Sequence, residues 1–175
     1  MKLTGRTILI IDDSAHGRFL IVRALKRAGL GLSTHCVTGK EETAAYLDGH
    51  GVYAERLIFP YPSLVIIELE MPRGDGFSAL LHLRQNPPCH LLPVLILSNS
   101  DDPGDMRTAY RLGATAYCIK PQNCAGILPI LANFLNQRLP PDPAAQIPRP
   151  RPVSLKAKAD YAKTNSSNRL LGVRP

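Results

Sequence analysis

The sequence predicts an α/β domain built around a parallel β-sheet with helices on both faces. Short runs of β-branched and apolar residues alternate along the chain with longer segments whose apolar residues recur at helical spacing. The short runs are continuously apolar, which is typical of strands buried on both faces of a sheet. Because connections between parallel strands are right-handed, the intervening helices pack back onto the sheet.

The strand and helix pairs follow one another in order. The first strand is predicted at Thr7 to Ile11, and the first helix at Ser14 to Gly29, where glycines at 29 and 31 end the helical pattern. Four further pairs are predicted at 32–37 and 40–47, 64–69 and 77–85, 94–97 and 105–112, and 116–119 and 125–137. We therefore expect five strands and five helices.

The composition favours a cytosolic protein. The chain has 175 residues, of which 45% are hydrophobic and 20% charged. Its longest apolar runs are far shorter than the roughly 20 residues that cross a bilayer. The first apolar run is interrupted by Asp12 and Asp13, so the N-terminus lacks the apolar region of a signal peptide. The four cysteines form no CxxC pair, which favours reduced thiols over a zinc site or disulfides.

The net charge of +7 belongs mainly to the C-terminal region. Residues 1–138 contain 14 basic and 12 acidic residues, whereas residues 139–175 contain 7 and 2. The second region also has 7 of the 16 prolines and a single aromatic residue, Tyr161. We therefore expect a domain at 1–138 and a basic, Pro-rich disordered tail at 139–175. Nucleic-acid binding through this tail is an alternative function, although its basic residues are spread among prolines and form no dense phosphate-binding patch.

Polar residues follow four of the predicted strands. Open parallel sheets place their binding sites at the carboxyl ends of the strands. Each position alone fits an ordinary structural role, such as a helix cap. Together they would surround one small pocket with acids, a hydroxyl and an ammonium group. The positions are Asp12-Asp13, 68–76, 98–102 and Lys120-Pro121.

Four motifs carry a resemblance to a known family. They are ILIIDDS (8–14), LVIIELEMPRGDGF (64–77), LILSNSDD (95–102) and LGATAYCIKP (112–121). Residues 5 to about 138 resemble the receiver domain of bacterial two-component response regulators. The long connection at 47–62 is similar to that of single-domain regulators paired with bacterial phytochromes. The resemblance implies a flavodoxin-like five-stranded parallel sheet of order 2-1-3-4-5, with helices on both faces.

The resemblance also implies roles for individual residues. In the family an acidic pair binds Mg²⁺, a Ser or Thr ending the fourth strand contacts the phosphoryl group, and a Lys before a proline ion-pairs with that group. Matched by motif, the acidic pair is Asp12 and Asp13, the hydroxyl is Ser98, the lysine is Lys120, and the switch aromatic is Tyr117.

The sequence departs from the family at the phosphoacceptor. The family's D-x-x-M-P occurs here as Glu68-Leu69-Glu70-Met71-Pro72. The extra methylene moves the carboxylate by roughly 1.5 Å and disturbs the positioning on which phosphoryl transfer depends. Glu68 could reach Lys120 and Ser98 as a phosphomimetic, or fill the metal pocket and hold an inactive-like conformation. Weak Mg²⁺ binding is expected from Asp12, Asp13, Glu68 and the Glu70 main-chain carbonyl.

We expect a non-enzymatic, single-domain response-regulator-like protein of a bacterial two-component phosphorelay. No helix-turn-helix pattern follows Arg138, so output by protein–protein contact is expected, without normal aspartyl phosphorylation. The resemblance implies a histidine kinase or a downstream regulator as partner, and a possible homodimer through the 105–136 face. A working phosphoacceptor at Glu68 or Glu70 is the alternative.

Overall fold

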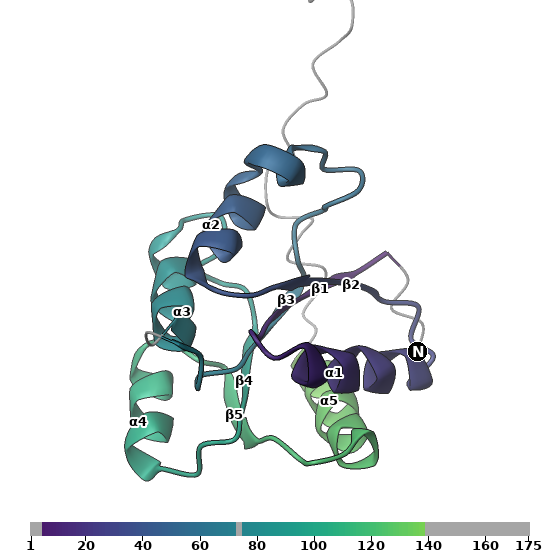
Figure 1. The fold of residues 1–175 in the computed structure, drawn as a ribbon, viewed down its shortest axis with the longest axis vertical. Coiled ribbons are helices and arrows are strands. Elements are labelled where there is room, and N and C mark those ends of the chain that lie inside the picture. Colours follow the sequence, from purple (N-terminus) through teal and green to yellow (C-terminus); the bar gives the residue numbers. More distant parts are fainter. Residues whose placement is uncertain (1–4, 73–74, 139–175) are drawn as a thin grey trace, which may run out of the picture.

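A five-stranded parallel sheet forms the centre of the molecule (Figure 1). The computed structural model describes residues 5–72 and 75–138, and the tail expected at 139–175 lies outside these ranges. The sheet has the order β2-β1-β3-β4-β5, which confirms the predicted fold class. The strands are β1 (Thr7–Ile11), β2 (Ser33–Val37), β3 (Leu64–Ile67), β4 (Val94–Ser98) and β5 (Ala116–Ile119).

Helices cover both faces of the sheet. Helices α1 and α5 pack against each other on one face, and α2, α3 and α4 cover the other (Figure 1). The segment after α2 also forms a short 3₁₀ helix, η1, which the sequence pattern did not predict. The helices are α1 (Ala15–Arg27), α2 (Lys40–Asp48), η1 (Gly51–Ala54), α3 (Asp75–Gln85), α4 (Pro103–Arg111) and α5 (Cys124–Arg138).

The central strands are buried on both sides. Alternate residues of a strand point to opposite faces, so Leu9 and Ile11 join the core beneath α2 and α3, whereas Ile8 and Ile10 join the core beneath α1 and α5. This two-sided burial explains why the strands are continuously apolar in the sequence. The predicted third strand extended to Leu69, but β3 ends at Ile67, which places Glu68 in the turn beyond the sheet.

Side-chain caps fix where the helices at the carboxyl edge begin. The Ser14 hydroxyl accepts a hydrogen bond from the Gly17 amide (3.1 Å) at the start of α1. The Asp102 carboxylate accepts one from the Gly104 amide (2.8 Å) at the start of α4. Such caps satisfy amides that have no partner within the helix. The turns that carry the candidate site residues are therefore tied directly to helix N-termini.

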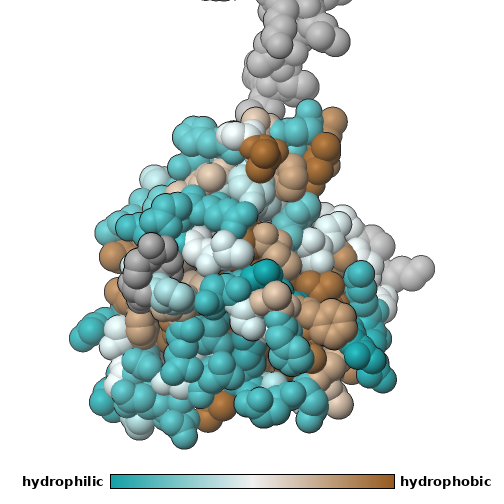
Figure 2. Space-filling view, viewed as in Figure 1, coloured by the Kyte–Doolittle hydropathy of each residue, from teal (hydrophilic) through white to brown (hydrophobic). Residues whose placement is uncertain are grey.

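The segment between α2 and β3 is anchored by Arg56. Its guanidinium donates to the carbonyls of Tyr46 and Leu47 (both 2.7 Å) at the end of α2, and lies 4.3 Å from the centroid of the Tyr61 ring. These bonds satisfy carbonyls that the helix end leaves without partners. Apolar side chains gather at the same end of the molecule (Figure 2), and the most exposed are Val52, Leu57 and Ile58.

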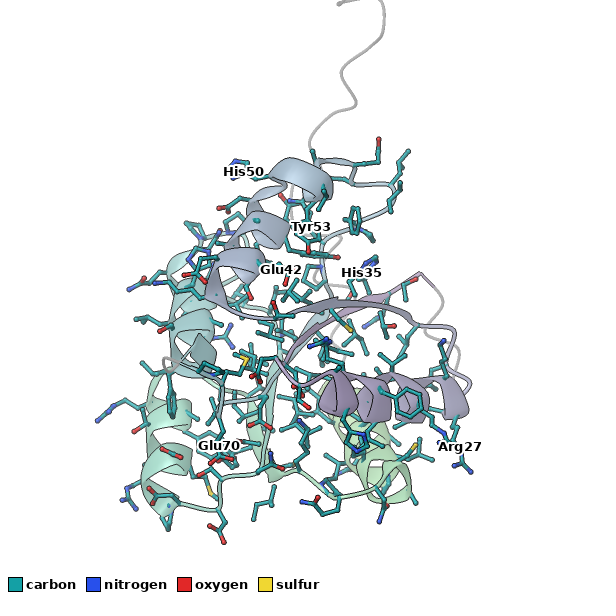
Figure 3. The ribbon with its side chains drawn as sticks, viewed as in Figure 1. Arg27, His35, Glu42, His50, Tyr53 and Glu70 are labelled. Carbon is teal, nitrogen blue, oxygen red and sulfur yellow. The ribbon has the colours of Figure 1, made fainter. Side chains whose placement is uncertain are left out.

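Tyr53 connects η1 to α2. Its hydroxyl donates to Glu42 Oε1 at 2.5 Å, and its ring packs against Tyr46 (Figure 3). Burial, followed by the hydrogen bond to Glu42 and the charge of that carboxylate, raises the pKa of Tyr53 to about 12.

The described helices include none that is long and apolar enough to cross a bilayer.

Candidate functional site

Four of the predicted site residues meet in one buried pocket at the carboxyl edge of the sheet. Asp12 follows β1, Glu68 follows β3, Ser98 ends β4 and Lys120 follows β5. Their exposed fractions are 1%, 4%, 0% and 8%. Charges this deeply buried are tolerated only when they are paired and hydrogen-bonded, so the contacts among these four side chains determine what the pocket can do.

The Lys120 ammonium joins the two buried carboxylates. Its Nζ lies 2.6 Å from Asp12 Oδ2 and 3.0 Å from Glu68 Oε2. Burial alone would lower the pKa of Lys120. The hydrogen bond and charge of Asp12, together with those of Glu68, outweigh burial and raise this pKa above its ordinary value. Lys120 is therefore a cation throughout the physiological pH range.

Both carboxylate oxygens of Glu68 accept hydrogen bonds. Oε1 accepts from the Ser98 hydroxyl at 2.5 Å and from the Glu70 amide at 3.1 Å. Oε2 accepts from Lys120 and, at 3.5 Å, from the Asn99 side-chain amide. Sequence reasoning did not single out Asn99, whose only signal was its position directly after Ser98. These contacts fix the Glu68 carboxylate in one orientation.

Asp12 is fixed by the turn between β1 and α1. Its Oδ1 accepts from the Ser14 amide at 2.8 Å, while Oδ2 accepts from Lys120. The Arg18 guanidinium donates to the main-chain carbonyls of Asp12 (2.7 Å) and Asp13 (2.9 Å). Arg18 was not predicted as a site residue, because donation to main-chain carbonyls leaves no pattern in the sequence.

A chain of hydrogen bonds leads from the pocket to Tyr117. Besides donating to Glu68, the Ser98 hydroxyl accepts from the Ser100 amide at 3.3 Å. The Ser100 carbonyl accepts from the Tyr117 hydroxyl at 2.8 Å, and the Tyr117 ring is only 9% exposed. The turn after β4 therefore lies between the Glu68 carboxylate and the predicted switch aromatic, and contacts both.

The predicted metal ligands do not all converge. Asp12 and Glu68 meet, but Asp13 is exposed, and so is Glu70, which was expected to contribute its main-chain carbonyl. Across residues 5–72 and 75–138, no group of three or more His, Cys, Asp or Glu side chains is arranged to hold a metal ion. Lys120 Nζ lies against both Asp12 Oδ2 and Glu68 Oε2, so this arrangement does not fit a divalent cation.

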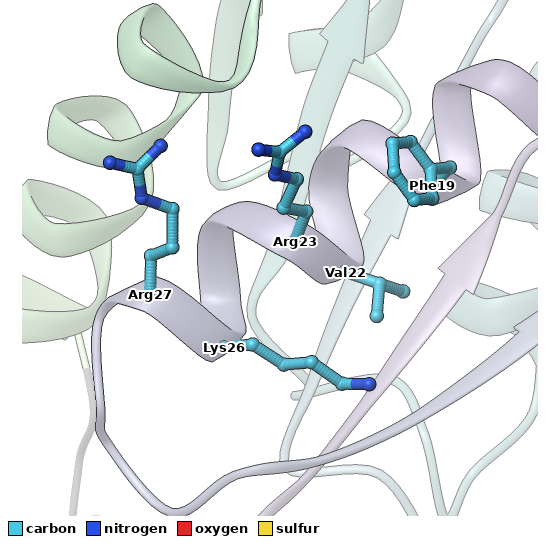
Figure 4. Close-up of a pocket in the computed structure, with 5 residues that line it drawn as sticks. All are labelled: Phe19, Val22, Arg23, Lys26 and Arg27. Atoms are coloured by element: carbon cyan, nitrogen blue, oxygen red, sulfur yellow. The ribbon is translucent and has the colours of Figure 1, made fainter.

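A separate pocket lies on the exposed face of α1 (Figure 4). The Arg23 guanidinium is 5.9 Å from the centroid of the Phe19 ring, and α1 has no acidic residue. The pocket lining combines two apolar side chains with three basic ones, and neither a carboxylate nor a histidine is among them. Its lining residues are Phe19, Val22, Arg23, Lys26 and Arg27.

Comparisons with known proteins agree with this geometry. The family model of the response regulator receiver domain matches residues 8–132. Response regulator Rcp1 of Synechocystis sp. is 27% identical over 118 residues, which are 67% of this chain and 78% of Rcp1. Two similar solved structures are also response regulators.

One is response regulator RPA3017 in red light signaling of R. palustris. It has a TM-score of 0.70 and 29% identity, with 77% of this chain and 94% of that chain covered. The phosphorylated cyanobacterial phytochrome response regulator RcpA has a TM-score of 0.67 and 26% identity, with 75% and 91% covered. The chain therefore belongs to the response regulator receiver domain family of two-component signalling, and it is homologous to the single-domain phytochrome response regulators.

Proposed function

We propose that this chain is a single-domain, atypical receiver of a two-component phosphorelay that acts by protein–protein contact without normal aspartyl phosphorylation. The observation that carries the proposal is the state of Glu68 at the phosphoacceptor position. This carboxylate is 4% exposed and is bound by the Ser98 hydroxyl (2.5 Å) and the Lys120 ammonium (3.0 Å). It acts as a phosphomimetic rather than as a nucleophile.

The hydrogen bonds to Glu68 oppose its phosphorylation. In-line attack on a phosphodonor needs a carboxylate oxygen that is free and correctly positioned. Both oxygens of Glu68 already accept hydrogen bonds, so attack would require breaking a buried charge-assisted bond. Ser98 and Lys120 are also the groups that the family resemblance assigns to the phosphoryl group. Glu68 supplies about −1 to these partners, where an aspartyl phosphate would supply nearly −2.

The proposed output is the surface formed by residues 105–136. Ser98 and Ser100 link Glu68 to Tyr117, and Tyr117 belongs to β5, within this surface. Tyr110 and Ile119 on the same surface are 50% and 52% exposed, which favours a role in contacts. A second copy of the chain could dock here.

Receiver domains interact with histidine kinases and downstream effectors, and they bind Mg²⁺ or Mn²⁺ at an acidic site. Rcp1 has been solved in a Mn²⁺-bound form. For this chain we propose a histidine kinase or a downstream regulator as partner, cytoplasmic location and no enzymatic activity. The proposed domain is 1–138, followed by the basic segment 139–175, and any binding of Mg²⁺ is weak.

Incubation with acetyl phosphate and Mg²⁺ tests the proposal. The wild-type chain should remain unmodified, as measured by intact mass and by hydroxylamine-sensitive labelling. Glu68→Asp shortens the side chain by one methylene and should form an acyl phosphate. Glu70→Gln is the matched control, because Glu70 is exposed and its replacement should change neither result.

Labelling of the wild-type chain at Glu68 would show that the chain is a working phosphoacceptor. Labelling that disappears in Glu70→Gln would instead assign the reaction to Glu70. If Glu68→Asp also remains unlabelled, the pocket has lost more of the phosphorylation machinery than the nucleophile alone.

A further inference from the structure

We infer that the Lys120 ammonium is the resident cation of this pocket, that Gly17 makes the room for it, and that a divalent cation binds only by displacing it. The inference goes beyond the proposed role of Glu68, because it concerns which cation balances the pocket rather than whether Glu68 accepts a phosphoryl group.

The contacts of Lys120 are those expected of an internal counterion. Its Nζ lies 2.6 Å from Asp12 Oδ2 and 3.0 Å from Glu68 Oε2, and all three side chains are at least 92% buried. Two carboxylates and one ammonium leave a net charge of −1. A divalent cation entering beside Asp12 and Glu68 would lie close to the Lys120 charge, and in a poorly solvated pocket that repulsion is strong.

Gly17 has no conformational reason to be glycine. It lies in the first turn of α1 and is not among the described glycines with positive φ. A glycine inside a helix is less favourable than alanine by roughly 0.5–1 kcal/mol. A packing requirement must therefore explain a glycine at this position.

The surroundings of Gly17 supply that requirement. A Cβ atom at position 17 would lie 2.4 Å from Asp12 Oδ2 and 2.8 Å from Lys120 Nζ. Both separations are shorter than a Cβ atom tolerates, so with a larger residue the Asp12 carboxylate, the Lys120 ammonium or both must shift. Glycine at position 17 thus allows the shortest ion pair of the pocket to form.

Arg18 adds to the positive charge that opposes a divalent cation at this site. Asp13 is exposed, and the Arg18 guanidinium binds the main-chain carbonyls of Asp12 and Asp13. A second fixed positive charge therefore lies on the turn that would supply two of the expected metal ligands.

The test is a Mg²⁺ titration of the full chain, followed through the NMR signals of the Asp13 and Ser14 amides. Lys120→Met removes the charge and keeps an unbranched stem. Gly17→Ala keeps the charge and moves it away from Asp12. Both variants should bind Mg²⁺ at least tenfold more tightly than the wild type.

Gly104→Ala is the matched control for Gly17→Ala. Gly104 also lies in the first turn of a helix beside an aspartate, but its Cβ would be 3.3 Å from the Asp102 carboxylate oxygens. This variant should leave the Mg²⁺ affinity unchanged. Adding Asp12→Asn to Lys120→Met should abolish the gained affinity, which would locate the bound ion at Asp12.

Equal Mg²⁺ affinities in the wild type and Lys120→Met would overturn the inference, as would a gain that persists when Asp12 is replaced. If Gly17→Ala does not fold, Lys120→Met with and without Asp12→Asn decides the question. None of these affinities depends on whether Glu68 is phosphorylated, so they separate this inference from the proposed function.

Discussion

At the scale of single residues, the length of Glu68 determines its contacts. The longer side chain carries its carboxylate to the Ser98 hydroxyl and the Lys120 ammonium, while the main chain stays at the end of β3. A carboxylate with an exposed fraction of 4% is stable only while these partners are present. The Ser98 hydroxyl donates to Glu68 and also accepts from the Ser100 amide in the turn after β4. Removing it therefore tests its contribution to both the carboxylate and the turn.

Replacing Ser98 with alanine should destabilise the domain by about 2 kcal/mol, because a buried hydrogen bond to a charged group is lost. The Ser100 amide would also lose its acceptor, so its hydrogen exchange should accelerate more than that of β1. Urea denaturation and amide exchange measure the two effects. Ser33→Ala, at an exposed position of β2, is the control and should change neither. A Ser98→Ala variant as stable as the wild type would show that Glu68 does not depend on this bond.

The sequence could predict which residue types reach the pocket, but not which contacts they make. Asp12, Glu68, Ser98 and Lys120 were expected because each follows or ends a parallel strand, and parallel strands end at one edge. The 2.6 Å contact between Lys120 and Asp12 depends on the space above Gly17, which is set by how α1 packs. The packing of α1 against the sheet is a tertiary property, and no local sequence pattern predicts it.

At the scale of elements, the segment between α2 and β3 is held by one arginine. Arg56 donates to the carbonyls of Tyr46, Leu47 and Phe59 and stacks on Tyr61. The planar guanidinium can reach several carbonyls at once, which a lysine ammonium cannot do with the same geometry. Sequence reasoning recognised this segment as a long connection but not η1, because a four-residue helix is too short for periodicity to indicate.

Arg56→Lys keeps the charge and should still lower the free energy of unfolding by about 1–3 kcal/mol, since the partly buried hydrogen bonds from the guanidinium to main-chain carbonyls are lost. The damage should be local, so amides at 51–62 should exchange faster while those of β1 and β3 remain protected. Urea denaturation combined with hydrogen exchange distinguishes a local from a global effect. Arg107→Lys, at an exposed position of α4, is the matched control. Uniform loss of protection across the sheet would mean that this segment is part of the main cooperative unit.

At the scale of the whole molecule, the sheet separates two cores that differ in side-chain composition. The core between the sheet and α1 and α5 combines aliphatic side chains with Phe134 and Cys124, whereas the opposite core contains Tyr46 and Tyr117. The alternation of strands and helices predicted both layers, because two-sided burial requires apolar side chains on every strand position. The strand order came from the family resemblance, since periodicity cannot specify which strands are neighbours. Titratable groups buried on the second side couple stability to pH.

Stability should fall as the pH rises from about 9 to 12. Burial first, and then the hydrogen bond and charge of Glu42, raise the pKa of Tyr53 from 10 to about 12. Burial and the charge of Asp48 raise that of Cys89 from 9 to about 11. An acid with a raised folded-state pKa keeps its proton in the folded chain while the unfolded chain loses it. Its stabilising contribution is therefore complete below the ordinary pKa and is lost as the pH passes through the raised value.

Urea denaturation at a series of pH values from about 8 to 12 measures this decline. Tyr53→Phe removes one titrating group together with its bond to Glu42, so it should lower stability at pH 8 and flatten the decline above pH 10. Tyr61→Phe also removes a hydroxyl but keeps the ring that packs on Arg56, so it should leave the pH 8 stability nearly unchanged. A Tyr53→Phe variant whose stability declines as steeply as that of the wild type would mean that the bond between η1 and α2 is not coupled to unfolding. The alkaline loss would then arise from other groups whose pKa is raised, among them Tyr46, Cys89 and Lys120.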